Sequence, residues 1–264
     1  MLVTAQTLAR IAGASINDNM VSTAIGLQMA GIGAGLERPH RLAMLLSQLS
    51  HESMGWRYDR EIWGPTKAQA RYEGRKDLGN SQPGDGSRFR GRGPIQITGR
   101  ANYTAFTRWA RRMDADAPDF TAIPDAVNSN PWEGLGPIWY WSEGNPTGRS
   151  LNRLADMGDF EGVTRKINGG LNGYADRQAR YARAALVLIG RDPADLRGFQ
   201  QACGLTADGI PGVRTLAKLH SALLAAGPVR FKDTVPGHDA VPAQPSGGLI
   251  AAIISAILAI FRRA

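Results

Sequence analysis

Apolar residues recur with a helical period along much of the chain. The clearest case begins at Pro39 and places four leucines at positions i, i+3, i+4 and i+7 of one helix face, namely Leu42, Leu45, Leu46 and Leu49. Shorter stretches with the same period predict helices at 4–11, 18–31, 101–113, 131–142, 159–167 and 175–190. Because no alternating run is long enough for a sizeable sheet, we predict a mainly α protein.

The segment 55–100 interrupts this helical pattern. It is rich in glycine, arginine and aromatic residues and contains few β-branched residues, so we expect mostly loop with a short hairpin near 95–98. Within it, Gln96 and Thr98 alternate with Ile95 and Ile97. Side chains two residues apart in an extended segment point to the same face, so the two polar groups should lie side by side.

Changes in composition divide the chain into four units. Residues 1–190 form the helical domain, and 191–227 form a small helical module in which two helical stretches flank a turn at 208–212. Residues 228–248 contain four prolines without an apolar period, which predicts a linker. Residues 249–264 are predicted to form a C-terminal hydrophobic helix.

The C-terminal helix has the composition of a membrane-active segment. The run 249–261 reads LIAAIISAILAIF, in which 12 of 13 residues are apolar, and Arg262 and Arg263 follow it. As a helix it spans roughly 20 Å, which is short of a ~30 Å hydrocarbon core. We expect the stretch from Leu249 to Arg263 to meet an anionic membrane or envelope surface, or to self-associate through its small residues. The alternative is a helix docked on the protein's own surface.

Composition and charge limit the partners and the metal sites that the protein can have. The chain has 264 residues and a net charge of +8, which suits an anionic partner such as nucleic acid, a bacterial envelope or a negatively charged membrane. Its single cysteine, Cys203, excludes an intramolecular disulfide framework and a cysteine-cluster zinc site. The four histidines are scattered along the chain. We therefore predict neither a metal nor a cofactor.

Two glutamates stand out as candidate acid and base. At about 100° per residue, Glu52 lies on the flank of the leucine stripe, where partial desolvation would favour a protonated general acid. Glu61 follows nine residues later, and its neighbours Arg57 and Arg60 would keep it ionised. Glycoside hydrolysis uses two carboxyl groups in such contrasting settings. The spacing alone also fits a salt-bridged Glu52 and an ordinary surface Glu61.

Several motifs together resemble glycoside hydrolase family 19, which comprises plant-type chitinases and a branch of phage endolysins. The resemblance rests on Glu52 preceded by histidine, on Glu61, and on residues 91–99, which read GRGPIQITG and are followed by Asn102 and Tyr103. The aromatic stretch 137–141 and the Asn-Gly-Gly motif at 168–170 agree with it. The resemblance covers roughly residues 35–185, and the short gap between the two glutamates is like that of the endolysin branch.

The resemblance implies a lysozyme-like helical glycosidase domain with a long, loop-rich active-site segment. Carried over residue by residue, Glu52 matches the general acid, Glu61 the carboxylate that activates water in an inverting mechanism, and Thr98 the position that helps to hold this water. The positions that match substrate-contacting residues are Gln96, Tyr103, Asn168 and Arg177. From its place beside the carboxylates, Trp63 either stacks on a sugar or packs within the protein.

These features lead to a main hypothesis and two alternatives. The main one is an endolysin-type bacteriolytic glycosidase that cuts the β-1,4 bond between the amino sugars of peptidoglycan, with the C-terminal helix aiding access. The first alternative is a chitinase acting on poly-N-acetylglucosamine. The second is a membrane-disrupting tail joined to a non-catalytic wall-binding domain. The module at 191–227 resembles the second half of a peptidoglycan-binding helical domain, and a structural hairpin without affinity is its other interpretation.

The N-terminal segment predicts where the protein acts. It lacks a basic region followed by a continuous apolar run, so we expect no cleavable signal peptide. The chain would then accumulate in the cytoplasm of the host bacterium and reach the cell wall or periplasm at lysis, through a holin or its own tail. The expected partner is peptidoglycan, and we expect no nucleic-acid partner.

Overall fold

The computed structural model describes residues 1–231. The C-terminal helix predicted at 249–264, and the linker from residue 232 onward, lie outside these described residues. Within 1–231 the chain folds into helices and forms no named strand, which confirms the prediction of a mainly α protein. None of the described helices is both long enough and apolar enough to span a bilayer.

The helices lie close to where the apolar period predicts them. The α-helices are α1 (Ala5–Ala12), α2 (Asp18–Ala30), α3 (Pro39–Glu52), α4 (Lys67–Ala70), α5 (Asp85–Arg88), α6 (Arg100–Met113), α7 (Trp132–Trp139), α8 (Asn152–Asp156), α9 (Phe160–Asn168), α10 (Tyr174–Leu188), α11 (Leu196–Ala202) and α12 (Val213–Ala225). Two 3₁₀ turns, η1 (Lys76–Leu78) and η2 (Pro124–Asn128), and one π turn, η3 (Tyr140–Gly144), complete the set.

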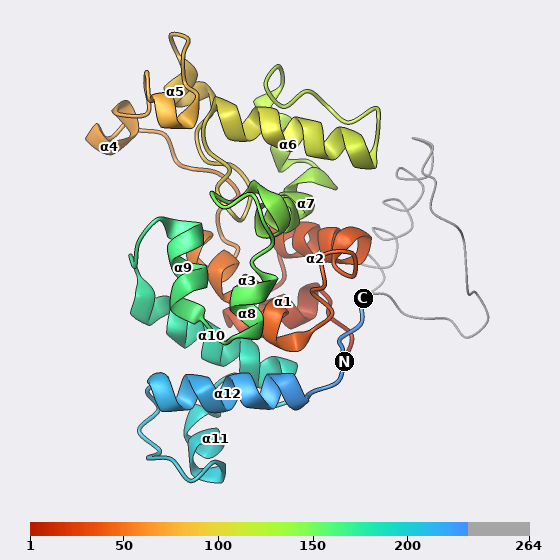
Figure 1. Cartoon of the computed structure of the whole chain (residues 1–264), viewed down its shortest axis with the longest axis vertical. Helices are drawn as coiled ribbons and strands as arrows, with labels where there is room; N and C mark the ends of the chain where they lie inside the picture. Colours follow the sequence, from red (N-terminus) through yellow and green to blue (C-terminus); the bar gives the residue numbers. More distant parts are fainter. Residues whose placement is uncertain (232–264) are drawn as a thin grey trace, which may run out of the picture.

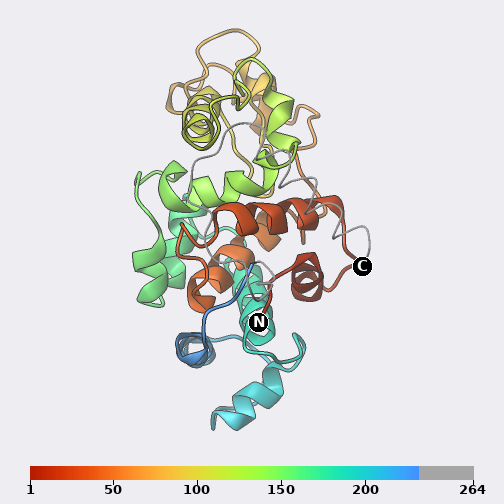
Figure 2. The same cartoon turned by 90° about the vertical axis from the view of Figure 1, so that its right-hand side faces the viewer.

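The elements stack along the long axis of the molecule (Figures 1 and 2). One end holds α4, α5 and α6, the middle holds α1, α2, α3, α7 and α10, and the other end holds α11 and α12. The central helix α3 begins with proline at its first position, where no amide hydrogen is needed. Its four leucines are all 1 % exposed or less, so the predicted stripe faces the core.

Helices α2 and α7 touch backbone to backbone. A Cβ added to Gly134 would lie 1.8 Å from the carbonyl oxygen of Ser22, and one added to Gly26 would lie 2.1 Å from the carbonyl oxygen of Gly134. Only glycine allows this approach. The contact brings the start of α7 against the middle of α2 and buries the side chain of Glu133 beside it.

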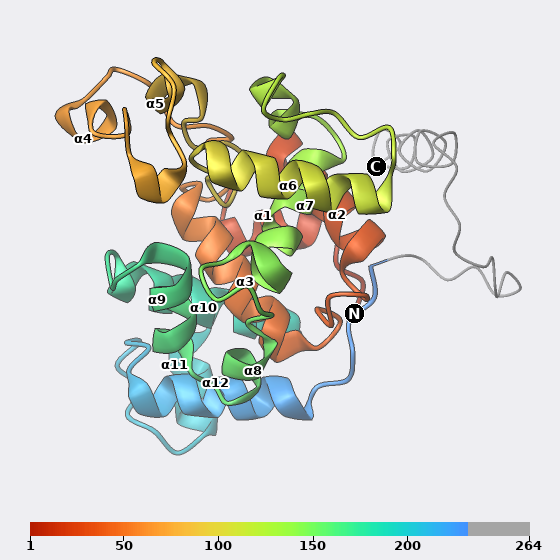
Figure 3. The same ribbon diagram turned by 45° about the horizontal axis from the view of Figure 1, so that its top comes forward.

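The loop-rich segment 55–100 contains the short helices α4 and α5 and the turn η1, which are too brief for a periodic signal. The expected hairpin is present at 92–97. The amide of Arg92 donates to the carbonyl of Ile97 at 3.1 Å, and the reverse bond is 2.9 Å. Figure 3 shows this segment covering one end of the helical core.

The C-terminal module packs on the helical domain. Helix α12 lies against α10 and α3, and its Leu219 and Leu223 are fully buried. Residues 229–231, which the sequence assigns to the linker, belong to the fold instead. The amide of Val3 donates to the carbonyl of Arg230 at 2.8 Å, and Phe231 is 1 % exposed. Burial of Phe231 and pairing with the N-terminal residues hold this stretch in place.

Candidate active site

Glu52 ends helix α3 and is held by a cation from α10. The Nη2 of Arg177 donates to Glu52 Oε1 at 2.5 Å, and the two side chains are 1 % and 21 % exposed. The same guanidinium donates from Nη1 to Gln48 Oε1 at 2.5 Å and from Nε to the carbonyl of Asn172 at 3.0 Å. Arg177 therefore lies inside the protein, where it fixes Glu52, and its contact with substrate stays a prediction.

A chain of buried polar groups continues behind this pair. Gln48 is fully buried, and its Nε2 donates to Thr164 Oγ1 at 3.0 Å. The hydroxyl of Thr164 in turn donates to the carbonyl of Phe160 at 2.9 Å. Helices α3, α9 and α10 are thus cross-linked directly below Glu52.

His51 anchors the start of α10 from the neighbouring position. Its Nδ1 lies 2.6 Å from Asp176 Oδ2, and Arg180 Nε donates to the same oxygen at 2.6 Å. A Cβ on Gly173 would lie 2.2 Å from His51 Cε1, so glycine is needed where the loop passes the ring. These contacts place His51 beside the catalytic candidate as a support.

Tyr140 is a neighbour of Glu52 that the sequence analysis did not assign. Burial, followed by the nearby charge of Glu52, raises the pKa of Tyr140 to about 12. Its hydroxyl therefore stays protonated at physiological pH, and its contact with the carbonyl of Ile167 is long at 3.5 Å. The sequence feature that could have pointed to Tyr140 was its position within the aromatic stretch 137–141.

Glu61 is held by neutral donors. Gln69 Nε2 donates to its Oε1 at 3.1 Å, and the amide of Gly91 donates to its Oε2 at 3.2 Å. The expected arginine neighbours are engaged elsewhere, which corrects that part of the prediction. Arg60 Nη2 donates to Asp59 Oδ2 at 2.9 Å, and Arg57 lies over the ring of Tyr58.

Gly91 joins Glu61 to the polar face of the hairpin. A Cβ on Gly91 would lie 2.5 Å from Gln96 Oε1 and 3.3 Å from Thr98 Oγ1, so both side chains approach its backbone. Gln96 and Thr98 are half-buried, and the hydroxyl of Thr98 donates to the carbonyl of Gln96 at 2.8 Å. The structure thus brings together three of the predicted residues, Glu61, Gln96 and Thr98.

Tyr103 has no exposed surface, and its substrate contact stays a prediction. Its hydroxyl donates to the carbonyl of Arg90 at 2.8 Å and accepts from Arg92 Nη1 at 2.7 Å. Burial raises the pKa of Tyr103 to about 12. Tyr103 therefore supports Arg90 and Arg92, the residues on either side of Gly91.

Trp63 and Asn168 are both half-buried. The ring of Trp63 lies 6.1 Å from that of Tyr72, and burial together with the charge of Glu61 raises the pKa of Tyr72. Asn168 ends α9, and its Oδ1 accepts from the amide of Asn172 at 3.3 Å. Trp63 thus belongs to the surroundings of Glu61, whereas Asn168 belongs to those of Glu52.

A third acidic side chain lies buried behind the loop that carries Glu61. Glu133 is 4 % exposed, and burial raises its pKa to about 7, with a smaller raising contribution from Asp59 and a lowering hydrogen bond from Ser22. Its Oε1 is buried without a hydrogen-bond partner in the part of the chain described. Glu133 is therefore stabilised in its protonated form.

Glu133 predicts a loss of stability toward alkaline pH. Its folded pKa of about 7 exceeds the ordinary 4.5, so its stabilising contribution is complete below pH 4.5 and is lost as pH rises through 7. The loss should approach about 3 kcal/mol in the free energy of unfolding. Glu133→Gln should remove this dependence, which urea denaturation at a series of pH values measures. Equal pH dependence of both proteins would contradict the assignment.

Residues 1–231 contain no group of three or more His, Cys, Asp or Glu side chains arranged to hold a metal ion. The chemistry available at the site is that of two carboxyl groups in different settings. Glu52 is paired with a buried cation and lies near a neutral phenol, and Glu61 accepts from neutral donors.

Comparison with known sequences gives partial matches. No family model matches the chain. A protein of Haemophilus influenzae described as containing a glycosyl hydrolase family 19 domain is 39% identical over 116 residues, which are 44% of this chain and 50% of that protein. An endochitinase of Arabidopsis thaliana is 31% identical over 136 residues, 52% of this chain and 42% of the plant protein. The chain thus spans half or less of these curated relatives.

Comparison with solved structures covers more of the chain. Chitinase C from Streptomyces griseus superposes with a TM-score of 0.52 at 21% identity, over 78% of each chain. A second structure, that of a bacterial family 19 chitinase, superposes with a TM-score of 0.53 at 20% identity, over 73% of this chain and 97% of that one. The protein therefore has the fold of the family 19 chitinases and is similar in sequence, over about half its length, to family 19 glycosyl hydrolases.

Proposed function

We propose that the protein is a glycosidase that hydrolyses the β-1,4 bond between the amino sugars of peptidoglycan with inversion. Glu52 protonates the leaving oxygen, and Glu61 deprotonates a water molecule that attacks from the opposite face of the sugar. The observation that carries the proposal is geometric: Arg177 fixes Glu52 in one orientation, and uncharged donors hold both oxygens of Glu61.

Glu61 is suited to the role of base. Its donors, Gln69 Nε2 and the Gly91 amide, orient both oxygens without supplying a neutralising positive charge. A carboxylate with its charge intact can accept a proton from water. The hydroxyl of Thr98 also approaches Gly91, 3.3 Å from where a Cβ would lie, and under the proposal it helps to hold that water.

Glu52 is suited to the role of acid through its geometry. In the described structure a protein group bonds only to its Oε1, which leaves Oε2 for the proton and the leaving oxygen. Arg177 is itself fixed by Gln48 and Asn172, so the carboxyl is held in one orientation. A fixed orientation lowers the entropic cost of proton transfer in the bound complex.

The proposal is tested by digesting purified peptidoglycan and analysing the products by mass spectrometry. We expect muropeptides with newly formed reducing sugars. The identity of the sugar at the new reducing end shows which glycosidic bond is cut. Cleavage of peptide or amide bonds, with intact glycan strands, would overturn it.

Chitin is the second candidate substrate because the plant relative and the structural neighbours are named chitinases. The two substrates share their N-acetylglucosamine units, so the same acid and base serve both. Comparing kcat/KM on chitin oligomers with kcat/KM on peptidoglycan fragments of equal length decides between them. Under the main proposal the peptidoglycan fragments are the better substrates.

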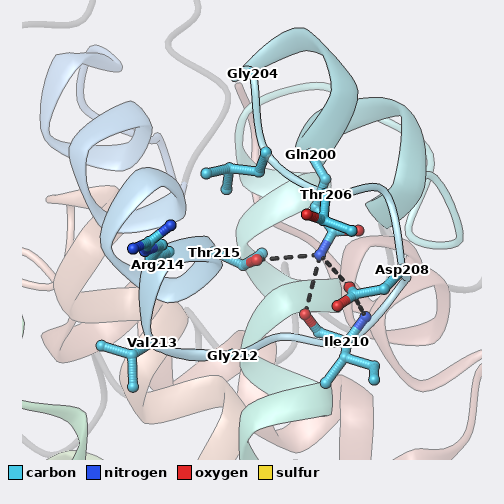
Figure 4. A pocket seen from close by; sticks show the side chains of 10 residues that line it. Gln200, Gly204, Thr206, Asp208, Ile210, Gly212, Val213, Arg214 and Thr215 are labelled. Atoms are coloured by element: carbon cyan, nitrogen blue, oxygen red, sulfur yellow. Dashed lines mark hydrogen bonds between the residues drawn. The ribbon is translucent and has the colours of Figure 1, made fainter.

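The module at 191–227 is proposed to bind the cell wall. A cavity of about 370 Å³ lies between α11 and α12 (Figure 4). Its wall is fixed by the buried Gln200, whose Nε2 donates to Asp208 Oδ1 at 2.8 Å and to Thr215 Oγ1 at 3.1 Å. Beside it, Ile210 and Val213 are 64% and 82% exposed, which is typical of an interaction surface.

Replacing these two apolar residues tests the module. Ile210→Ser together with Val213→Ser should weaken cosedimentation with purified wall several-fold, because exposed apolar contacts are lost. Stability should change by less than about 1 kcal/mol, since both side chains lie at the surface. Hydrolysis of short soluble fragments should stay the same. Unchanged cosedimentation would rule out this surface.

The segment 249–264 is proposed to help the enzyme reach the wall at lysis through contact with an anionic membrane. Deleting residues 247–264 should reduce lysis of intact cells without changing hydrolysis of purified wall. If neither activity changes, the segment has no role in access. If the wild type lyses cells but leaves purified wall intact, the tail itself is the lytic agent.

A further inference from the structure

The excess positive charge of the chain is confined to one segment. Residues 57–112 contain 13 of the 31 Lys and Arg residues but only 5 of the 23 Asp and Glu residues. Their excess of 8 equals the net charge of the whole protein, and the rest of the chain is balanced. We call residues 57–112 the basic lobe.

The basic lobe forms one end of the molecule. It comprises α4, η1, α5, α6 and the hairpin at 92–97, and it lies opposite the end that holds α11 and α12 (Figures 1 and 2). It also carries Glu61. The charge is therefore concentrated at the end of the protein that supplies the proposed base.

Part of this charge is used within the protein. Arginines of the lobe pair with carboxylates in five places: Arg60 with Asp59, Arg75 with Asp77, Arg92 with Asp125, Arg100 with Asp85, and Arg112 with Glu143. These five arginines hold loops together. Arg88, Arg90 and Arg111 also donate to backbone carbonyls, so only part of the charge of the lobe is left for a ligand.

Three exposed cations, Lys67, Arg71 and Lys76, lie within ten residues around α4 and η1 and form what we call the α4 cluster. Across residues 1–231 none of the three has a carboxylate within ion-pair distance. The acidic residues of the same stretch are occupied, because Glu73 accepts from the amides of Gly84 and Gly86, and Asp77 pairs with Arg75. Glu73 keeps its negative charge because amide donors carry none, so the cluster faces solvent with three positive charges beside this one negative charge.

The α4 cluster is fixed close to the proposed base. Gln69 lies in α4 between Lys67 and Arg71, is 6 % exposed, and donates to Glu61 Oε1 at 3.1 Å. Its own Oε1 accepts from the amide of Thr66 at 2.7 Å. Gln69 therefore ties α4, with Lys67 at its start and Arg71 just after its end, to the proposed base.

We propose that the basic lobe, through the α4 cluster, binds the carboxylates of the peptide side chains of peptidoglycan while the glycan strand lies at Glu61. The proposal rests on the glycosidase function and names what the enzyme recognises besides sugar. Carboxylates spaced along a strand match an array of unpaired cations, and opposite charges raise the rate and strength of association. A neutral glycan such as chitin offers no such partner.

A charge-matched pair of variants tests the proposal. The α4 variant is Lys67→Gln, Arg71→Gln and Lys76→Gln. The control is Arg38→Gln, Arg149→Gln and Arg153→Gln, three exposed cations outside both the lobe and the module at 191–227 that make no ion pair within residues 1–231. Both variants lose three positive charges. All six side chains are exposed, and none makes a hydrogen bond or an ion pair within the described residues, so both variants should melt within a few degrees of the wild type.

The readout is cosedimentation with purified wall from which hydrofluoric acid has removed the phosphate-linked polymers. At about 50 mM salt the α4 variant should bind about tenfold more weakly than the wild type, and at about 500 mM salt the difference should vanish because the charges are screened. The control should bind as the wild type does. On peptidoglycan the α4 variant should show a raised KM with kcat unchanged, and on neutral chitin oligomers no change.

Three results would overturn the proposal. An equal loss of wall binding in both variants would mean that binding depends on the net charge of the protein and not on the α4 cluster. Loss of wild-type binding when the phosphate-linked polymers are removed would assign the cations to phosphates. Tighter cluster-dependent binding to duplex DNA than to wall would assign the lobe to nucleic acid. Because cosedimentation needs no catalysis, a wild type that binds wall but cleaves no glycan would refute the glycosidase function separately.

Discussion

Glu52→Gln is expected to lower kcat on purified peptidoglycan by roughly 10²–10⁴-fold, with KM nearly unchanged. Glutamine keeps the shape and the hydrogen bond from Arg177 but has no proton to give to the leaving oxygen. Steady-state release of reducing sugars measures the effect. A residual rate is expected, because binding and the Glu61 base remain in place.

The control for this variant is Glu143→Gln. Glu143 is also a glutamate paired with an arginine, Arg112, but both side chains are well exposed. This variant should keep the wild-type kcat, so a loss specific to Glu52 reports its chemistry. Urea denaturation shows whether the uncompensated charge of Arg177 destabilises the Glu52 variant. A Glu52 variant within about threefold of the wild-type kcat would show that Glu52 is not the acid.

Glu61→Ala should also lower kcat by roughly 10²–10⁴-fold, because no group remains to deprotonate the water. Added azide should restore glycan cleavage, since this anion attacks without losing a proton and fits the space that the shorter side chain leaves. The product would be a glycosyl azide with inverted configuration. Mass spectrometry detects it directly.

The matching control is Glu52→Ala in the same azide buffer. Azide replaces water as nucleophile but does not protonate the leaving oxygen, so this variant should stay slow. Rescue of Glu52→Ala and not of Glu61→Ala would mean that the two roles are exchanged. Rescue of neither would remove Glu61 from the role of base.

The longer helices are predicted well because the spacing of their apolar residues, which is visible in the local sequence, decides which face is buried. The leucine stripe of α3 is buried as predicted, and Glu52 on its flank is 21% exposed, between the core and solvent. The boundaries of the linker are predicted less well. Val229 and Phe231 are 5% and 1% exposed. The amide of Val229 donates to the carbonyl of Glu37 and the ring of Phe231 lies against Gly31, contacts that no local pattern records.

The sequence does not predict which side chains and amides bond to the two glutamates. Arg177 is 125 positions from Glu52, and only the packing of α10 along α3 brings them together. Arg60 is adjacent to Glu61 in sequence, yet it turns toward Asp59. The donors of Glu61 come from a helix of four residues and from a loop, neither of which has a periodic signal.

The polar residues near the hairpin show the same limit. Gln96 and Thr98 approach Gly91 together, as alternation predicts, because that relation is local. Tyr103 lies in the first turn of α6. It is buried because that turn packs against the residues that lead into the hairpin. Motif resemblance marks a residue as important without stating whether it contacts the substrate or supports one that does.

The most direct test of the two-carboxylate account is the configuration of the sugar released first. Proton NMR, recorded soon after the enzyme is mixed with a soluble peptidoglycan fragment, distinguishes the anomers before mutarotation equilibrates them. Inversion at a β bond, with Glu61 activating water, predicts that the α anomer appears first. Initial release of the β anomer would contradict the account, because it requires a double displacement in which water does not attack the glycan directly.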